Sequence, residues 1–183
     1  MNKNKTKILD CTLRDGGYYT NWDFSKKLIE GYIKYTNKLN LDYLEIGYRN
    51  IKNSRKYKGQ FYYTPKETLK FFANKSKHQI AIMIDYKSIR IDQLEDILFD
   101  CRNYVKLIRI AISPNEVKNI QDYIDIIKKL HFEVALNVMH LSEWDINQII
   151  DDTKDLKNVD YFYLVDSYGA LFPDDLQNLF SLI

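Results

Sequence analysis

The sequence predicts a single α/β domain built on a parallel sheet. Six short apolar runs alternate with stretches of helical periodicity, at intervals of roughly 30 residues, which is the pattern of repeated βαβ units. Several runs are apolar almost throughout, as expected for strands that are covered on both faces. No linker rich in Gly, Pro or Ser interrupts the series, so we expect residues 1–183 to form one domain.

The six runs are the expected strands, and they should lie side by side in chain order. They cover Ile8–Leu13, Tyr43–Tyr48, Ile80–Asp85, Leu107–Ile112, Glu133–Met139 and Tyr161–Asp166. The sheet should curve into a partial barrel with the helices outside.

The expected helices show apolar residues at spacings of three and four. They include Leu28, Ile29 and Ile33 in the first, Leu94 to Cys101 in the third and Ile120 to Ile127 in the fourth. Thr64 should cap the second helix ahead of Pro65 at its first position. Ser142 and Pro173 should begin the last two helices. The polar, basic segment Asn50–Gly59 is expected to be an excursion after the second strand.

Composition excludes several classes of protein. The net charge of +2 argues against a nucleic-acid partner, and no apolar run is long enough to cross a membrane. No signal peptide is visible. The two cysteines, Cys11 and Cys101, lie on separate elements, which is typical of a cytoplasmic protein without disulfides.

Polar residues gather where the expected strands end. In parallel α/β folds the reactive face lies at the carboxyl ends of the strands, so these residues should meet there. They are Arg14 and Asp15, then Glu45, Tyr48 and Arg49, then Asp85, Ser113, Asn137 and His140, and finally Asp166, Ser167 and Tyr168.

The first of these groups points to chemistry. Arg14 can neutralise developing negative charge, and Asp15 offers an oxygen ligand to a divalent cation. Gly16 and Gly17 should let the backbone turn sharply and let a ligand approach. The alternative on residue types alone is a structural ion pair at the end of a strand, and it stays open at this point.

The motifs together carry a resemblance to a known family. Segment 10–16, DCTLRDG, resembles the first-strand signature of the DRE-TIM metallolyases, which include 4-hydroxy-2-oxovalerate aldolase, HMG-CoA lyase and isopropylmalate synthase. Segments 43–47, 137–139 and 166–170 are similar to the second, fifth and sixth strand motifs, the fifth as in the aldolase branch. The resemblance implies a TIM (β/α) barrel, here incomplete, with six βα units and without the region expected to hold the seventh and eighth strands.

The resemblance also implies a reaction. Such enzymes hold a divalent metal, Mn²⁺ or Mg²⁺, and make or break a carbon–carbon bond beside a carbonyl. Asp15 would ligate the metal, Arg14 would stabilise the enolate oxygen of a 2-oxo acid, and Asp10 and Glu45 would orient them. The implied activity is cleavage of a 4-hydroxy-2-oxo acid to pyruvate and an aldehyde.

Two features depart from the family pattern. Where the aldolases place a histidine acid/base after the metal aspartate, this chain has Tyr18 and Tyr19, so Tyr18 is the catalytic candidate although a phenol is a poorer base near neutral pH. The His-x-His metal ligands of the seventh strand have no counterpart in residues 1–183. We therefore expect little turnover from this chain alone.

The histidines offer little replacement. His78 is expected at the surface, and His131 should end the fourth helix, where a cation suits the helix dipole. Only His140 should lie near the reactive face. Asn137, Asp166 and Ser167 complete the expected substrate-binding and orienting groups.

Two other functions remain open. One is a Claisen-type acyltransferase on the same scaffold, and the other is an inactive truncated barrel that acts only as an assembly partner. The expected ligand is a small 2-oxo acid, and a second copy of the chain or a complementing barrel fragment stays open as a protein partner. A reading frame that continued past Ile183 into a His-x-His strand would favour the enzyme.

Overall fold

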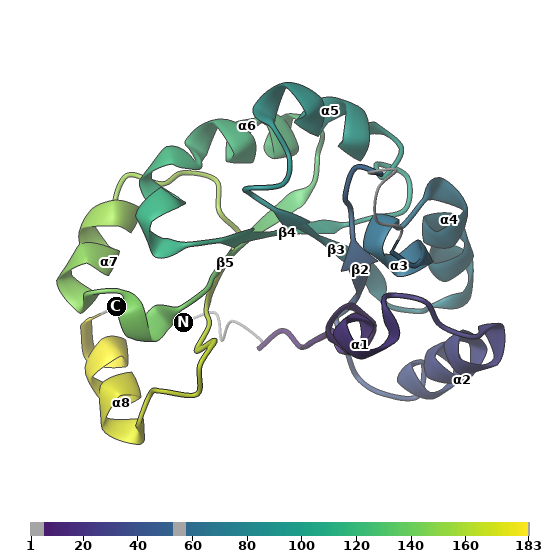
Figure 1. Cartoon of the computed structure of the whole chain (residues 1–183), viewed down its shortest axis with the longest axis horizontal. Helices are drawn as coiled ribbons and strands as arrows, with labels where there is room; N and C mark the ends of the chain where they lie inside the picture. The colour runs from purple at the N-terminus through teal and green to yellow at the C-terminus, as the bar shows by residue number, and fades with distance from the viewer. Residues whose placement is uncertain (1–5, 53–57, 183) are drawn as a thin grey trace.

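Six parallel strands in sequential order form the centre of the molecule. The structure is a computed structural model that describes residues 6–52 and 58–182. The strands are β1 (Leu9–Asp10), β2 (Tyr43–Tyr48), β3 (Gln79–Asp85), β4 (Leu107–Ile112), β5 (Glu133–Val138) and β6 (Tyr161–Leu164). The sheet curls into half of a barrel with the helices along its outer side (Figure 1). The predicted incomplete (β/α) barrel and its strand order are confirmed.

Helices connect the strands and cover the convex face. The α-helices are α1 (Thr12–Thr20), α2 (Lys26–Thr36), α3 (Gln60–Tyr63), α4 (Lys66–Lys75), α5 (Ile91–Phe99), α6 (Gln121–Lys129), α7 (Ile146–Thr153) and α8 (Pro173–Leu182). Two 3₁₀ turns, η1 (Pro114–Asn119) and η2 (Leu141–Glu143), precede α6 and α7. No helix in 6–52 or 58–182 is long and apolar enough to cross a membrane.

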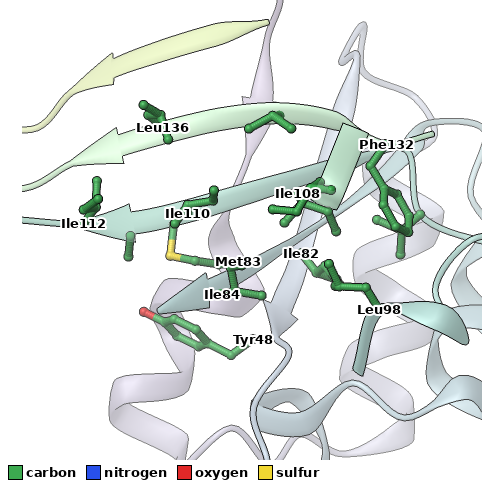
Figure 2. Packing of buried hydrophobic residues seen from close by; sticks show 14 of the residues in the cluster. Tyr48, Ile82, Met83, Ile84, Leu98, Ile108, Ile110, Ile112, Phe132 and Leu136 are labelled. Carbon is green, nitrogen blue, oxygen red and sulfur yellow. The ribbon is translucent and has the colours of Figure 1, made fainter. Parts of the chain in front are cut away.

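The main hydrophobic core lies between the sheet and the helices. Because side chains alternate along a strand, one set from each strand points outward. Figure 2 shows Ile82 and Ile108 of neighbouring strands together with Leu98 of α5 in this core, and all three side chains are fully buried. Burial of each aliphatic side chain of this kind contributes about 1.5–3 kcal/mol relative to exposure.

The concave face carries two groups of polar side chains. The group nearer the amino ends of the strands, here called the tyrosine layer, consists of Tyr43, Glu133 and Tyr161. The group nearer the carboxyl ends, here called the charged layer, consists of Arg14, Glu45, Arg109 and Asn137. Small apolar side chains, Ala81, Leu107 and Ala135, lie with Tyr43 in a second buried cluster.

The prediction for the first strand is wrong in part. β1 covers only Leu9–Asp10, and the next residues form helix α1. Leu13 and Gly17, four residues apart, are the buried face of this helix against the sheet. Gly17 does not make a turn: a Cβ there would lie 2.1 Å from the Trp22 ring, so glycine is needed for close helix packing.

Smaller predictions are also corrected. Thr64 is buried and its hydroxyl donates to the Tyr48 carbonyl at 2.7 Å, so it does not cap α4, and Pro65 takes the N-cap position. Ser142 lies in the 3₁₀ turn η2, and helix α7 begins only at Ile146. Much of the expected excursion, residues 53–57, lies outside the described residues.

Two histidine predictions need correction as well. His78 is buried, because its two ring nitrogens are 2.8 Å from the carbonyl oxygens of Leu41 and Thr36. It lies between α4 and β3, joins this link to the link between α2 and β2, and is not a surface residue. His131 lies beyond the end of α6, at a positive φ of 68°.

Candidate active site

Arg14 lies in the first turn of α1, where the helix meets the barrel interior. Its Nε donates to Glu45 Oε1 at 2.7 Å, and its Nη1 donates to Asp15 Oδ1 at 2.5 Å. Burial lowers the pKa of Arg14, but the charge of Glu45 and its hydrogen bond outweigh that effect, so the pKa lies above its ordinary value. The Nη2 atom makes no hydrogen bond within the described part of the chain. One donor of a fixed guanidinium is therefore available to a ligand.

Glu45 joins two guanidinium groups in the middle of the half-barrel. Its side chain is fully buried on β2, and its second oxygen accepts from Arg109 Nη1 at 2.7 Å. Arg109 Nη2 in turn donates to Asn137 Oδ1 on β5. A buried carboxylate is tolerated only when it is paired and hydrogen-bonded, and here each oxygen has its own cation.

Asp15 is exposed at the rim and is engaged by its neighbours. Its Oδ1 accepts from Arg14, and its Oδ2 is 3.3 Å from the Sγ atom of Cys11. Burial, then the hydrogen bond and charge of Asp15, raise the pKa of the Cys11 thiol to about 11. Cys11 is therefore a protonated donor at neutral pH and is a poor nucleophile.

Asp10 organises the connection between β1 and α1. Its Oδ1 accepts from the Thr12 amide at 3.0 Å and from the Tyr32 hydroxyl at 2.6 Å, and its Oδ2 accepts from the Thr12 hydroxyl at 3.1 Å. Burial and this hydrogen bond raise the pKa of Tyr32. Asp10 thus anchors the start of α1 to α2, and it acts on the helix that carries Arg14.

Tyr18 lies one turn after Arg14 on α1 and is largely exposed, at 64%. Its hydroxyl is 2.9 Å from that of Tyr48, so the two phenols share a hydrogen bond. Burial, followed by this hydrogen bond, raises the pKa of Tyr48. Arg14 Cζ is 6.0 Å from the centroid of the Tyr48 ring, so Tyr48 lies between the guanidinium and the Tyr18 hydroxyl in this chain of contacts.

His140, Asp166 and Ser167 form a second group at the ends of β5 and β6. The Ser167 hydroxyl accepts from the His140 amide at 2.9 Å, and the His140 ring stacks on Tyr168 with centroids 5.0 Å apart. Asp166 accepts from the amides of Leu171 and Ala170, and these bonds lower its pKa. These contacts shape the loop before α8, and within 6–52 and 58–182 none of them reaches the charged layer.

The structure thus brings together only part of the predicted site. Hydrogen bonds link Arg14 to Asp15 and Glu45 and, through Arg109, to Asn137, whereas Tyr18 is connected to Arg14 only by way of Tyr48. Arg14 and Asp15 belong to a helix and not to the end of a strand, and Asn137 lies inside β5.

The metal site expected from the sequence is not complete in the described residues. No three His, Cys, Asp or Glu side chains in that part of the chain are grouped so that they could hold a metal ion. Asp15 is the one carboxylate at the rim beside Arg14, and both its oxygens already accept a hydrogen bond. The residues present therefore do not by themselves fit a divalent ion.

A cavity of about 330 Å³ lies elsewhere, among α2, α3 and α4 on the convex side. Its lining is mostly apolar and includes Phe24, Ile29, Phe61, Phe71 and Phe72. None of the predicted site residues lines it. We assign the candidate site to the charged layer because the donors and charges, which the chemistry requires, lie there.

Arg109 is the site residue that sequence inspection overlooked. It is the only charged residue of the run Leu107–Ile112, and its side chain is 5% exposed. An arginine inside an otherwise apolar strand is costly to bury without partners, so its presence in this run could have indicated a buried polar site. Its partners lie 64 and 28 residues away in the sequence, so no local pattern could identify them.

Comparison with known proteins supports this assignment of the fold. No protein-family model and no curated protein matches the chain. A solved structure that is similar to this chain in sequence as well as in fold has been found. It is the N-terminal domain of a putative aldolase from Bacteroides vulgatus, with 43% identity and a TM-score of 0.89. The match covers 96% of this chain, which spans 59% of the length of that one.

Other similar structures share the fold at low identity. The carboxyl transferase domain of Rhizobium etli pyruvate carboxylase, with pyruvate, has a TM-score of 0.74 and 15% identity over 99% of this chain and 34% of that one. The same domain with oxamate and biotin has a TM-score of 0.75 at the same identity. The (β/α) half-barrel is thus a scaffold that solved enzymes contain.

Proposed function

We propose that this chain carries the enolate-stabilising part of an aldolase-type carbon–carbon lyase of the DRE-TIM metallolyase kind, acting on a 4-hydroxy-2-oxo acid. The observation that carries the proposal is the fixed Arg14 guanidinium at the rim of the half-barrel, with Nη2 left for a ligand. The 43% identity to the N-terminal domain of a putative aldolase supports the same reaction class.

Arg14 is suited to the charge that this reaction develops. Breaking the bond between C3 and C4 of a 4-hydroxy-2-oxo acid leaves an electron pair that becomes the pyruvate enolate, with negative charge on the C2 oxygen. A planar guanidinium held by Glu45 can donate to that oxygen without reorganising during the step. The aldehyde leaves from C4 as the proton of the C4 hydroxyl is removed.

Tyr18 is the proposed partner in proton transfer. Tyr18 is largely exposed, and its hydroxyl shares a hydrogen bond with Tyr48, whose ring centroid lies 6.0 Å from Arg14 Cζ. In the cleavage direction this pair would receive the C4 hydroxyl proton and return a proton to C3 of the enolate.

We expect the complete enzyme to need a divalent metal, as the family resemblance implies. Mn²⁺ or Mg²⁺ would polarise the substrate carbonyl. Asp15 is the carboxylate that this chain would offer, and further ligands would have to come from outside the described residues. We therefore expect weak metal affinity and little turnover from residues 1–183 alone.

The proposal is tested by following pyruvate release from a 4-hydroxy-2-oxo acid in a coupled assay, with Mn²⁺ or Mg²⁺ supplied. The chain is assayed alone and within any longer polypeptide or complex that contains it. We expect release by the larger form, and loss of activity in Arg14→Ala. Product formed only from an acyl-CoA and a 2-oxo acid would establish the Claisen alternative, and no turnover in any form would contradict both.

A further inference from the structure

Arg109 has an unusual set of contacts for a residue in the centre of a strand. Its two terminal nitrogens donate to Glu45 on β2 and Asn137 on β5, and its Cζ lies 4.4 Å from the centroid of the Tyr163 ring on β6. Its Nε is buried and has no hydrogen-bond partner in the described residues. One side chain on β4 therefore spans the concave face from β2 to β6.

Glu45 transmits the position of Arg109 to Arg14. One carboxylate oxygen binds Arg14 Nε and the other binds Arg109 Nη1, both at 2.7 Å. In 6–52 and 58–182, Glu45 is the only residue of the sheet that hydrogen-bonds the Arg14 guanidinium, because the other bond goes to Asp15 on the same helix. Rotation of the carboxylate would therefore move the guanidinium.

We infer that Arg109 is a positioning residue, which fixes the catalytic guanidinium of Arg14 by holding the far oxygen of Glu45. The inference rests on the proposed function, because positioning matters to the reaction only if Arg14 acts on the enolate. A need for fold stability does not by itself explain the arrangement, since a whole buried ion pair can often be replaced by apolar side chains at no loss of stability. The neighbouring Ala81, Leu107 and Ala135 are apolar already.

The direct test observes Arg14 itself by NMR of arginine side chains in the ¹⁵N-labelled chain. Bound to Glu45, the Arg14 Nε–H group should give a resolved, slowly exchanging signal. We expect Arg109→Met to shift or broaden this signal in a protein that remains folded. If Arg109→Met does not fold, Arg109→Lys replaces it, and the same change is expected because an ammonium cannot hold Glu45 and Asn137 together in the planar fork geometry.

Tyr43→Phe is the matched control. It removes a buried hydroxyl from the same concave face without touching the charged layer, so the Arg14 signal should not move. An unchanged Arg14 signal in folded Arg109→Met, or in folded Arg109→Lys where Arg109→Met does not fold, would overturn the inference. So would an equal change in Tyr43→Phe, since that would reveal a general response of the barrel.

Kinetics separate this inference from the proposed function. In the form that releases pyruvate, Arg109→Met should lower kcat about 10²-fold with little change in KM, as expected for a misplaced catalytic group. A wild-type kcat in Arg109→Met would overturn the positioning role while leaving the aldolase proposal intact. If no form releases pyruvate but the Arg14 signal still moves, the structural coupling holds and the proposed reaction fails.

Discussion

The charged layer and the tyrosine layer lie on the same concave face and use some of the same strands, yet they treat charge differently. In the tyrosine layer, Glu133 accepts from the Tyr43 hydroxyl at 2.5 Å, and its other oxygen lies 3.3 Å from Lys106, which is partly exposed. The charge of Glu133 is therefore compensated by a lysine that is accessible to solvent. In the charged layer, Glu45 is fully buried and shared by two guanidinium groups.

The difference indicates that the fixed, preorganised charges of the half-barrel lie in the charged layer. A carboxylate near solvent can be satisfied by water if a partner is lost, so its neighbours are individually dispensable. A buried carboxylate has no such substitute, and removal of one partner leaves an uncompensated charge. Substitutions of equal size in the two layers should therefore differ greatly in their effects on stability and on turnover.

Glu45→Leu should have the largest effect on stability. It leaves the buried Arg109 and the mostly buried Arg14 without their shared anion, and breaking a buried pair in this way costs about 3–5 kcal/mol. Urea unfolding of the wild-type and variant chains measures the difference. A loss below about 1 kcal/mol would show that the guanidinium groups find other partners or reach water.

Arg14→Ala should have the largest effect on catalysis. Removing a preorganised donor to an oxyanion lowers turnover about 10²- to 10³-fold. Arg14→Lys should not restore the rate, because a point charge cannot reproduce the planar fork that Glu45 and Asp15 hold. Steady-state pyruvate release measures both variants, and full activity in Arg14→Lys would mean that charge alone suffices.

Tyr43→Phe should have a moderate effect on stability and none on catalysis. The Tyr43 hydroxyl donates to a carboxylate, and a hydrogen bond of this type contributes about 1.5–3 kcal/mol. Glu133 keeps Lys106 as a partner, so the lower end of that range is expected. Thermal or urea unfolding measures the loss. A fall in kcat together with stability would show that the two layers are coupled.

The smallest effect is expected in the reactivity of Cys11, whose thiol contacts Asp15. With its thiol pKa raised to about 11, the thiolate fraction at pH 8 is about a hundredfold below that of a thiol with a pKa of 9, the ordinary value. Alkylation should be slow and should keep rising with pH up to about 11. Asp15→Asn should lower the pKa in part, because burial is the larger cause, and should speed the reaction. Mass mapping separates Cys11 from the buried Cys101, and no change in Asp15→Asn would contradict the contact.

Most of the fold was predictable because the apolar runs and the helical spacing agree over the whole chain. The limits of β2 and β4 match the predicted runs. The first run failed because a short apolar segment fits a strand or a buried helix turn equally well. The packing of Leu13 and Gly17 against the sheet favours the helix, and this is a tertiary contact that the local sequence does not show.

The candidate site was predictable in part. Arg14, Asp15 and Glu45 carry recognisable motifs, and the structure does bring them together. Arg109 was hidden because its meaning depends on Glu45 and Asn137, which come from other strands. His78 was misassigned for the same reason, since the carbonyl groups that bury it belong to distant residues.

The most direct test of the central claim isolates enolate formation from bond cleavage. Exchange of the pyruvate methyl protons with solvent deuterium, followed by NMR, reports the enolate alone. In the form of the protein that releases pyruvate, we predict that the wild type and Tyr43→Phe accelerate exchange equally, whereas Arg14→Ala is slower by about 10²- to 10³-fold. Exchange at the wild-type rate in Arg14→Ala would contradict the account, because the enolate would then form without the guanidinium that the charged layer holds in place.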